Sequence, residues 1–113
     1  MTFEVNGNRV SLDNEGYLLC PEDWDMDVAK ELAVRERLDM SEDHWTVVHF
    51  VRGYYEERQS VPEARHALKA LREALGKEKA SRKFLYSLFP YGYGQQACKI
   101  AGMRKPLKLM LDI

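Results

Sequence analysis

Apolar and polar residues alternate at the start of the chain and then recur at helical spacing along most of its length. In FEVNGNRVSL the alternation runs on both sides of Asn6-Gly7 and Gly7-Asn8. Either pair supplies the positive φ angles that a tight hairpin turn requires. The pattern predicts an N-terminal β-hairpin, then a second bend at Gly16. Because a lone hairpin is only marginally stable in water, we expect it to pack on the helices.

Apolar residues spaced by three or four positions predict about five helices. Pro21 suits a helix start, Ser41 and Ser81 suit N-caps, and Pro90 and Gly102 suit helix ends. The longest apolar stripe follows Ser41, so we expect that helix to be central. The predicted helices begin near Pro21, Ser41, Pro62, Ser81 and residue 94.

The third of these helices has two competing start signals. Ser60-Val61-Pro62-Glu63 has the spacing of a capping box, in which the Ser and Glu side chains bond each other's backbone N–H groups. A proline, however, disfavours a helical conformation in the residue before it. The start can therefore shift by one or two residues. Gly76 is the predicted end.

These elements predict a mostly α fold: a small orthogonal helical bundle with a helix-turn-helix-like element around residues 63–89. The length of 113 residues fits one domain. We expect a β-hairpin region over 1–20, a helical bundle over 21–102 and a C-terminal arm over 103–113.

Composition narrows the class of protein. Apolar residues make up 45% of the chain and charged residues 31%, as in soluble globular domains. No apolar run approaches the ~20 residues that cross a bilayer, so we expect no membrane partner. The first ten residues lack the basic and apolar regions of a secretory signal, which makes the cytoplasm the expected location.

The two cysteines and three histidines show no metal-ligand spacing, and we expect neither a metal nor a cofactor.

The net charge of −1 hides an asymmetry. Residues 1–58 carry 6 Lys/Arg and 14 Asp/Glu, a balance of −8, whereas residues 59–113 carry 11 and 4, a balance of +7. A polarised chain can offer a basic face to an acidic protein or to nucleic acid. Alternatively, the two halves pack together and neutralise each other.

Cys98 is the strongest candidate for chemistry. Thiolates are nucleophiles, and nearby cations lower a thiol pKa. Ala97 and Ala101, however, indicate close packing, and free cysteine is often a buried, inert residue. Cys20 stands beside acids, which raise a thiol pKa, and is the weaker candidate. The cations that follow Cys98 are Lys99, Arg104, Lys105 and Lys108.

Other motifs favour structural roles. The three histidines have no nucleophile nearby in sequence, and the aromatics of KFLYSLFPYGY have the spacing of core residues rather than of a base-stacking surface. A helix-turn-helix would place Arg82 and Lys83 near the start of a recognition helix, but many bundles have this shape without binding DNA.

Four ordered segments resemble the DsrC/TusE family of small sulfur-relay proteins: EGYL, EDHWTVVHFVRGYYEE, KFLYSLFPYG and QQACKIAGMRKP. The resemblance covers almost the whole chain. It implies a helical bundle with a helix-turn-helix-like element, a hairpin and a C-terminal arm. It also implies that sulfur is carried as a persulfide, or as a trisulfide between two cysteines. The implied partners are a DsrE-like (Tus) relay complex in tRNA thiolation, or sulfite reductase in dissimilatory sulfur metabolism.

The arm departs from the family pattern. Cys98 matches the first of the two cysteines of DsrC-type arms, but the position of the penultimate cysteine falls on Leu109, and Arg104 replaces the usual proline of GLPKP. A trisulfide within one arm is therefore excluded. The apolar tail suits docking, either on its own bundle or on another protein; its large residues are Leu107, Leu109, Met110 and Leu111.

Two hypotheses follow. In the first, the chain is a sulfur carrier, a sulfurtransferase in the relay sense, which uses Cys98 as a persulfide or a mixed disulfide. Its partner-binding residues would be Lys99, Arg104, Lys105 and Lys108. In the second, the chain is a non-catalytic paralogue that regulates by binding relay proteins, or DNA through the helix-turn-helix.

Overall fold

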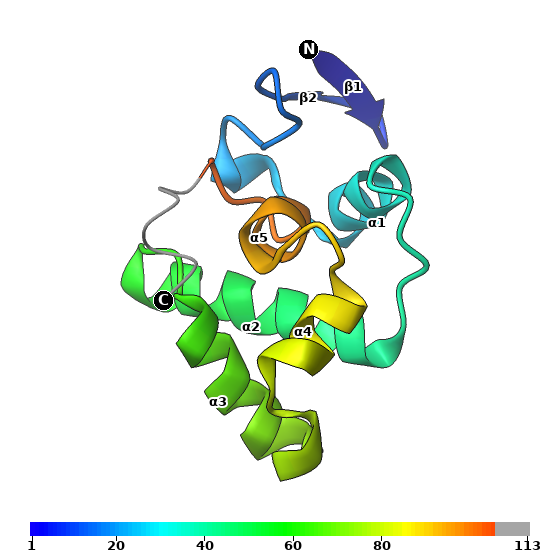
Figure 1. The fold of residues 1–113 in the computed structure, drawn as a ribbon. Coiled ribbons are helices and arrows are strands. Elements are labelled where there is room, and N and C mark those ends of the chain that lie inside the picture. Colours follow the sequence, from blue (N-terminus) through cyan, green and yellow to red (C-terminus); the bar gives the residue numbers. More distant parts are fainter. Residues whose placement is uncertain (106–113) are drawn as a thin grey trace.

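A two-stranded hairpin and a set of α-helices form the part of the chain that the structure, a computed structural model, describes: residues 1–105 (Figure 1). The predicted mostly helical fold with an N-terminal hairpin is confirmed. Short 3-10 turns lie at Pro21–Asp23 and Lys77–Lys79, and a π-helical turn lies at Tyr93–Ala97. The strands and helices are β1 (Thr2–Val5), β2 (Asn8–Ser11), α1 (Met26–Arg35), α2 (Glu42–Arg58), α3 (Ala64–Leu75), α4 (Arg82–Leu88) and α5 (Cys98–Ile100).

The hairpin turns at Asn6-Gly7, one of the two predicted pairs. Both residues have positive φ, 52° and 81°, and β1 and β2 pair antiparallel with Thr2 opposite Ser11. Gly16, with φ 91°, makes the predicted second bend. The hairpin packs on α1, as its marginal stability alone requires.

The first helix begins later than predicted. Pro21 starts only a 3-10 turn, and the chain becomes extended at Trp24. Helix α1 starts at Met26 because Asp25 is the better cap: its Oδ1 accepts from the Val28 N–H at 2.8 Å, whereas Cys20 makes no capping bond. This extended residue between the 3-10 turn and α1 places the Trp24 side chain on the end of α5.

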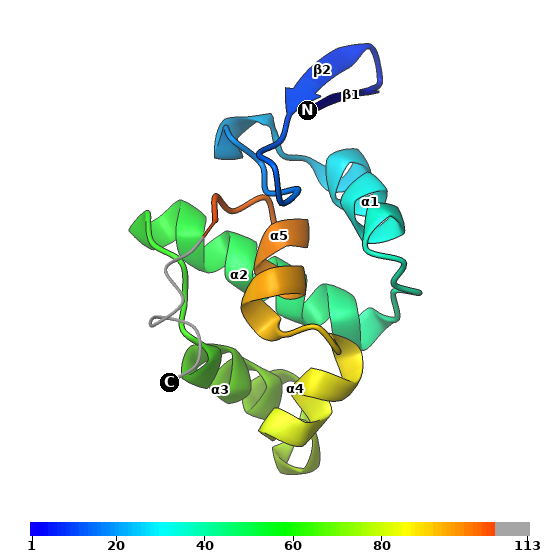
Figure 2. The same cartoon turned by 45° about the horizontal axis from the view of Figure 1, so that its top comes forward.

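Helix α2 runs through the middle of the molecule, as predicted from its long apolar stripe. Ser41 caps it, also as predicted, and accepts from the backbone N–H of His44. Figures 1 and 2 show α5 between α1 and α2, and α5 contacts both of these helices. The short helix that begins with Cys98 is therefore near the centre of the fold.

The capping box predicted at Ser60 lies three residues further on. Glu63 is the N-cap of α3, its side chain accepts from the backbone of His66, and His66 Nδ1 accepts from the Glu63 N–H at 3.1 Å. The start at Ala64 lies two residues after Pro62, in line with the expected shift. Gly76 ends the helix, as predicted.

The two charged halves of the chain are only partly interleaved. Helices α3 and α4, from the basic half, lie at the opposite end of the molecule from the hairpin and α1, which belong to the acidic half (Figures 1 and 2). Within residues 1–105, three ion pairs join the halves: Lys79–Asp43, Lys99–Glu36 and Lys105–Glu15.

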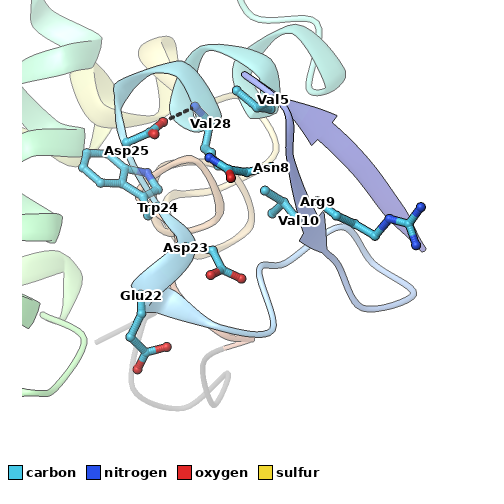
Figure 3. A pocket seen from close by; sticks show the side chains of 9 residues that line it. All are labelled: Val5, Asn8, Arg9, Val10, Glu22, Asp23, Trp24, Asp25 and Val28. Atoms are coloured by element: carbon cyan, nitrogen blue, oxygen red, sulfur yellow. Dashed lines mark hydrogen bonds between the residues drawn. The ribbon is translucent and has the colours of Figure 1, made fainter.

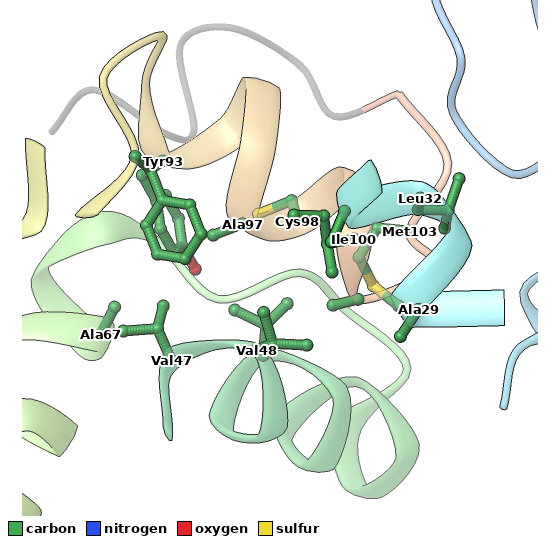
Figure 4. Close-up of a cluster of buried hydrophobic side chains, with 14 of the residues drawn as sticks. Ala29, Leu32, Val47, Val48, Ala67, Tyr93, Ala97, Cys98, Ile100 and Met103 are labelled. Atoms are coloured by element: carbon green, nitrogen blue, oxygen red, sulfur yellow. The ribbon is translucent and has the colours of Figure 1, made fainter. Parts of the chain in front are cut away.

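One apolar core joins the elements, and the segment that follows α4 supplies much of it. Figure 4 shows side chains from α1, α2 and α5 meeting there. Among residues 1–105, no helix has the length and apolar character needed to cross a membrane. The largest fully buried apolar side chains include Leu12, Leu18, Leu32, Leu71, Leu85, Phe89, Ile100 and Met103.

Candidate functional site

Cys98 is the first residue of α5 and directly follows the π-helical turn. Its backbone N–H donates to the Tyr93 carbonyl, which closes the wide π turn. Turns of this kind are rare and are often found at functional sites. In Figure 4 Cys98 lies within the cluster that includes Ala29 and Leu32 of α1 and Val48 of α2.

The Cys98 thiol is closed off from solvent. The residue is 0% exposed. Burial raises the pKa of this thiol to about 12, and the neighbouring Tyr93 hydroxyl offsets only part of the rise. Because the thiolate is the reactive form, a thiol with this pKa is protonated and unreactive at neutral pH. The structure thus describes the buried form of Cys98 that the packing of its neighbours indicated.

Two tyrosine hydroxyls hold the segment before Cys98 in place. Tyr93 donates to the Pro62 carbonyl at 2.7 Å, and Tyr17 donates to the Gly94 carbonyl at 3.2 Å. Burial raises the pKa of Tyr17 to about 12 and that of Tyr93 well above its ordinary value. Both hydroxyls therefore keep their protons at neutral pH and remain donors.

Lys99 directs its charge inward. Its ammonium lies 3.1 Å from Glu36 Oε2 and 4.9 Å from the centre of the Tyr17 ring. The side chain is only 12% exposed. The charge of Lys99, one of the four predicted partner-binding residues, is thus matched by a mostly buried carboxylate.

Arg104 and Lys105 are exposed at the start of the arm, whereas Lys108 lies outside the described residues. Lys105 pairs with Glu15, and this contact raises the pKa of Lys105. Within residues 1–105, no basic side chain lowers the pKa of the Cys98 thiol. Lys99, Arg104 and Lys105 therefore lie close to Cys98 in sequence but leave its thiol protonated.

Cys20, the weaker candidate, is the exposed cysteine of the two. It directly precedes the 3-10 turn at Pro21. A solvent-accessible thiol therefore lies on the segment that leads into α1, and any test of Cys98 must account for it.

Sequence reasoning missed two residues that fix the end of α5. The Trp24 Nε1–H donates to the Ile100 carbonyl at 2.8 Å. Arg52, on α2, donates to the carbonyls of Ala101 at 3.3 Å and Pro21 at 2.8 Å. The available signal was a lone arginine within the apolar stripe of α2, which is unfavourable unless the guanidinium is fully hydrogen-bonded.

A polar cavity of about 350 Å³ opens between the hairpin and the start of α1 (Figure 3). Asn8 and Arg9 line one side, and Glu22 and Asp23 line the other. Asp25, also at its edge, is already used as the α1 cap. Within residues 1–105, no group of three His, Cys, Asp or Glu side chains could hold a metal ion.

The three histidines differ in burial: His49 is exposed, His66 is half-buried and His44 is buried. His44 is buried, with its Nδ1 bonded to Ser41 and its Nε2 2.8 Å from the Leu88 carbonyl. The α3 and α4 helices follow each other at the positions predicted for a helix-turn-helix, with Arg82 and Lys83 exposed at the start of α4. Because many bundles contain two consecutive helices without binding DNA, DNA binding stays a prediction.

Comparisons with known proteins agree over nearly the full chain. The model of the family described as DsrC like protein matches residues 4–110. The sulfurtransferase TusE of Sodalis glossinidius is 44% identical over 108 residues, which cover 96% of this chain and 100% of that protein. The sulfurtransferase TusE homolog of Haemophilus influenzae is 40% identical over 96% of this chain and 99% of its own length.

Two solved structures share the fold. The oxidized gamma-subunit of the dissimilatory sulfite reductase (DsrC) from Archaeoglobus fulgidus superposes with a TM-score of 0.87 at 31% identity, over 95% of this chain and 97% of that one. DsrC of Allochromatium vinosum has a TM-score of 0.83 at 47% identity, over 94% and 95%. Sequence and structure together show that the chain belongs to the DsrC-like protein family.

Proposed function

We propose that this protein works in a sulfur relay, and that Cys98 is the thiol through which it exchanges sulfur. The proposal is supported by full-length relatives named as sulfurtransferases and by the shared fold. The observation that carries it is the position of Cys98 at the start of α5, directly after a π-helical turn, in the segment that leads to the arm. In this role the protein is a carrier that is loaded and unloaded by partners.

The chemistry requires a deprotonated, accessible thiol. The Cys98 thiolate would attack the outer sulfur of a partner's persulfide. A new S–S bond forms on Cys98, the partner's S–S bond breaks, and the partner leaves as a thiolate. Because the closed Cys98 has a pKa of about 12, the segment from Tyr93 to Met103 must move before this step.

The partners would be other relay proteins, either a DsrE-like complex or sulfite reductase. Arg104 and Lys105 are exposed cations near the end of the described chain and are suited to steering an acidic partner. Lys108 and the apolar tail would extend this surface, but they lie outside the described residues. The cytoplasm, a reducing compartment, would keep both cysteines as free thiols.

The test is persulfide loading, with intact mass as the readout. The reduced protein is incubated with a small-molecule persulfide donor, alongside Cys98→Ser and Cys20→Ser. A gain of one sulfur that persists in Cys20→Ser and disappears in Cys98→Ser supports the carrier. Loading that depends only on Cys20, or no loading even under mildly destabilising conditions, would exclude Cys98 as a carrier.

A second candidate function is regulation without sulfur chemistry, through binding to relay proteins or to DNA. The burial of Cys98 favours it. The basic charge of α3 and α4 leaves DNA as one partner to test. Binding to a DNA duplex that weakens steeply with added salt, and weakens further in Arg82→Glu, would support it, because phosphate contacts release counterions. No binding at low salt to DNA or to a relay protein would exclude it.

A further inference from the structure

The end of α5 is held by two side chains from elsewhere in the chain. Trp24 reaches it from the segment before α1, with its indole N–H bonded to the Ile100 carbonyl at 2.8 Å. Arg52 reaches it from α2, with Nη1 bonded to the Ala101 carbonyl at 3.3 Å. Consecutive carbonyls that have no further helical partner are thereby satisfied.

Arg52 also contacts Trp24 and the segment that carries it. Its Nη2 donates to the Pro21 carbonyl at 2.8 Å, close to Trp24 in sequence, and its guanidinium lies 4.7 Å from the centre of the Trp24 ring. Its Nε pairs with Glu56 at 2.9 Å. The side chain is 11% exposed, so these bonds are largely shielded from water.

Gly102 lets Trp24 lie directly on the backbone. Its φ of 79° turns the chain out of α5, and a Cβ built at this position would run into the Trp24 side chain. The ring therefore covers the exact point where helix α5 gives way to the arm. Met103, the next residue, is fully buried.

We propose that Trp24 and Arg52 form a latch that keeps Cys98 inaccessible, and that release of this latch is the step that exposes the thiol. Cys98 lies two residues before Ile100 and three before Ala101, whose carbonyls the latch holds. The Cys98 thiol cannot reach solvent while both carbonyls stay bonded, because α5 is wedged between α1 and α2. The latch residues act by positioning α5 through its last carbonyls.

The inference deepens the proposed function, since a gated thiol matters most where sulfur is exchanged. It can still be tested without any sulfur transfer. The readout is the rate at which iodoacetamide alkylates Cys98 in the folded protein, in a Cys20→Ser background where Cys98 is the one thiol. A failure of persulfide loading would leave this rate unchanged, so the two proposals can fail separately.

Arg52→Met is the decisive variant, and Arg58→Met is its matched control. Arg58 lies on the same helix and stacks on Tyr54 at 4.9 Å, as Arg52 stacks on Trp24. Loss of the charge-assisted bonds to the Ala101 and Pro21 carbonyls in Arg52→Met is expected to speed Cys98 alkylation about tenfold or more. Arg58→Met is expected to leave the rate within about twofold of the background.

Global unfolding is separated from latch release by urea. Alkylation through local opening is nearly independent of urea well below the unfolding midpoint, whereas alkylation through unfolding rises with the slope of the unfolding curve. A fast, urea-independent phase in Arg52→Met supports the latch. An acceleration that tracks global stability in both variants would overturn it.

Trp24→Phe decides the matter if Arg52→Met does not fold. Phenylalanine keeps an aromatic ring against Gly102 but cannot donate to the Ile100 carbonyl. Faster alkylation with the same urea midpoint supports the latch. An unchanged rate would show that Trp24 only fills space, and the proposal would be abandoned.

Discussion

The ammonium of Lys99 and the carboxylate of Glu36 lie 3.1 Å apart, and both side chains are mostly buried, at 12% and 20% exposed. Lys99 follows Cys98 directly, and Glu36 is the residue that ends α1. The ion pair thus joins α1 to the helix that bears the candidate thiol. Its ammonium also lies over the ring of Tyr17, which holds the π-helical turn.

Glu36→Gln is expected to destabilise the protein by about 1–3 kcal/mol, because it leaves the Lys99 charge unpaired in a mostly buried site. Lys99→Met should cost less, since it removes the charge and keeps the length of the side chain. Urea unfolding measures both. Equal losses in the two variants would show that the pair matters for packing rather than for charge.

The two cysteines should differ sharply in reactivity. Cys20 is exposed and Cys98 is buried. Folded protein treated with Ellman's reagent should quickly release one equivalent of the coloured thionitrobenzoate. A second equivalent should appear only after unfolding. In Cys20→Ser the fast equivalent should vanish. A fast equivalent that remains in Cys20→Ser would mean that Cys98 is open in solution.

Stability should fall at alkaline pH because Cys98 is held protonated. The thiol pKa is about 12 in the folded protein, against an ordinary value of 9.0. Below pH 9 both states hold the proton. As pH rises from 9 towards 12, only the unfolded state releases it, so the free energy of unfolding falls. By pH 10 the loss should be about 1 kcal/mol relative to pH 7.

Cys98→Ala should lack this part of the pH dependence. Burial, the largest cause of the raised pKa values of Tyr17 and Tyr93, is present in both proteins, whereas the smaller contribution of Cys98 to these pKa values is lost in Cys98→Ala. The comparison therefore reports the titration of Cys98 together with its coupling to the two tyrosines. Urea unfolding at pH 7 and pH 10 gives the difference. Parallel losses in wild type and Cys98→Ala would show that the Cys98 thiol is not held protonated.

Gly102→Ala should be strongly destabilising. The residue has φ 79°, which costs a non-glycine residue about 1 kcal/mol or more, and the new methyl group would run into Trp24. Gly53→Ala is the matched control: Gly53 lies within α2 with no atom near its would-be Cβ. Alanine there should stabilise the helix by up to about 1 kcal/mol. Thermal melts of both variants check the contrast.

The parts of the fold that could be predicted are those set by neighbouring residues, such as the hairpin turn and the helix caps. Asn6-Gly7, Ser41 and Ser81 act through their own or adjacent backbone, so their roles are written in a few residues of sequence. The start of α1 was misplaced because two local signals compete. Pro21 does begin a turn, but Asp25 supplies the stronger cap, and only the packed structure decides between them.

The candidate site was harder to predict because its contacts are long-range. Cys98 was found from its motif, but its burial depends on residues such as Tyr17 and Trp24, which lie more than 70 positions away. Arg52 gave only an indirect signal as a cation in an apolar stripe. Contacts between residues so far apart produce no periodic pattern in the sequence. The burial of the Cys98 thiol is therefore visible only in the structure.

The last prediction concerns His44, which joins α2 to the end of α4. Its Nδ1 accepts from the Ser41 N–H at 3.0 Å, so the ring proton is on Nε2 and is donated to the Leu88 carbonyl at 2.8 Å. The ring also meets Phe89 edge-on at 5.2 Å. The imidazole therefore closes a helix cap and satisfies a buried carbonyl at the same time.

His44→Ala should cost about 2–4 kcal/mol, because it opens a small cavity and leaves the Leu88 carbonyl without its partner. His49→Ala, at an exposed position of the same helix, should change stability by no more than about 0.5 kcal/mol. Urea unfolding measures both values. Hydrogen exchange at the Ser41 amide adds a local readout, which should accelerate only in His44→Ala. Similar small losses in the two variants would show that the α2 cap and the end of α4 are held by other contacts.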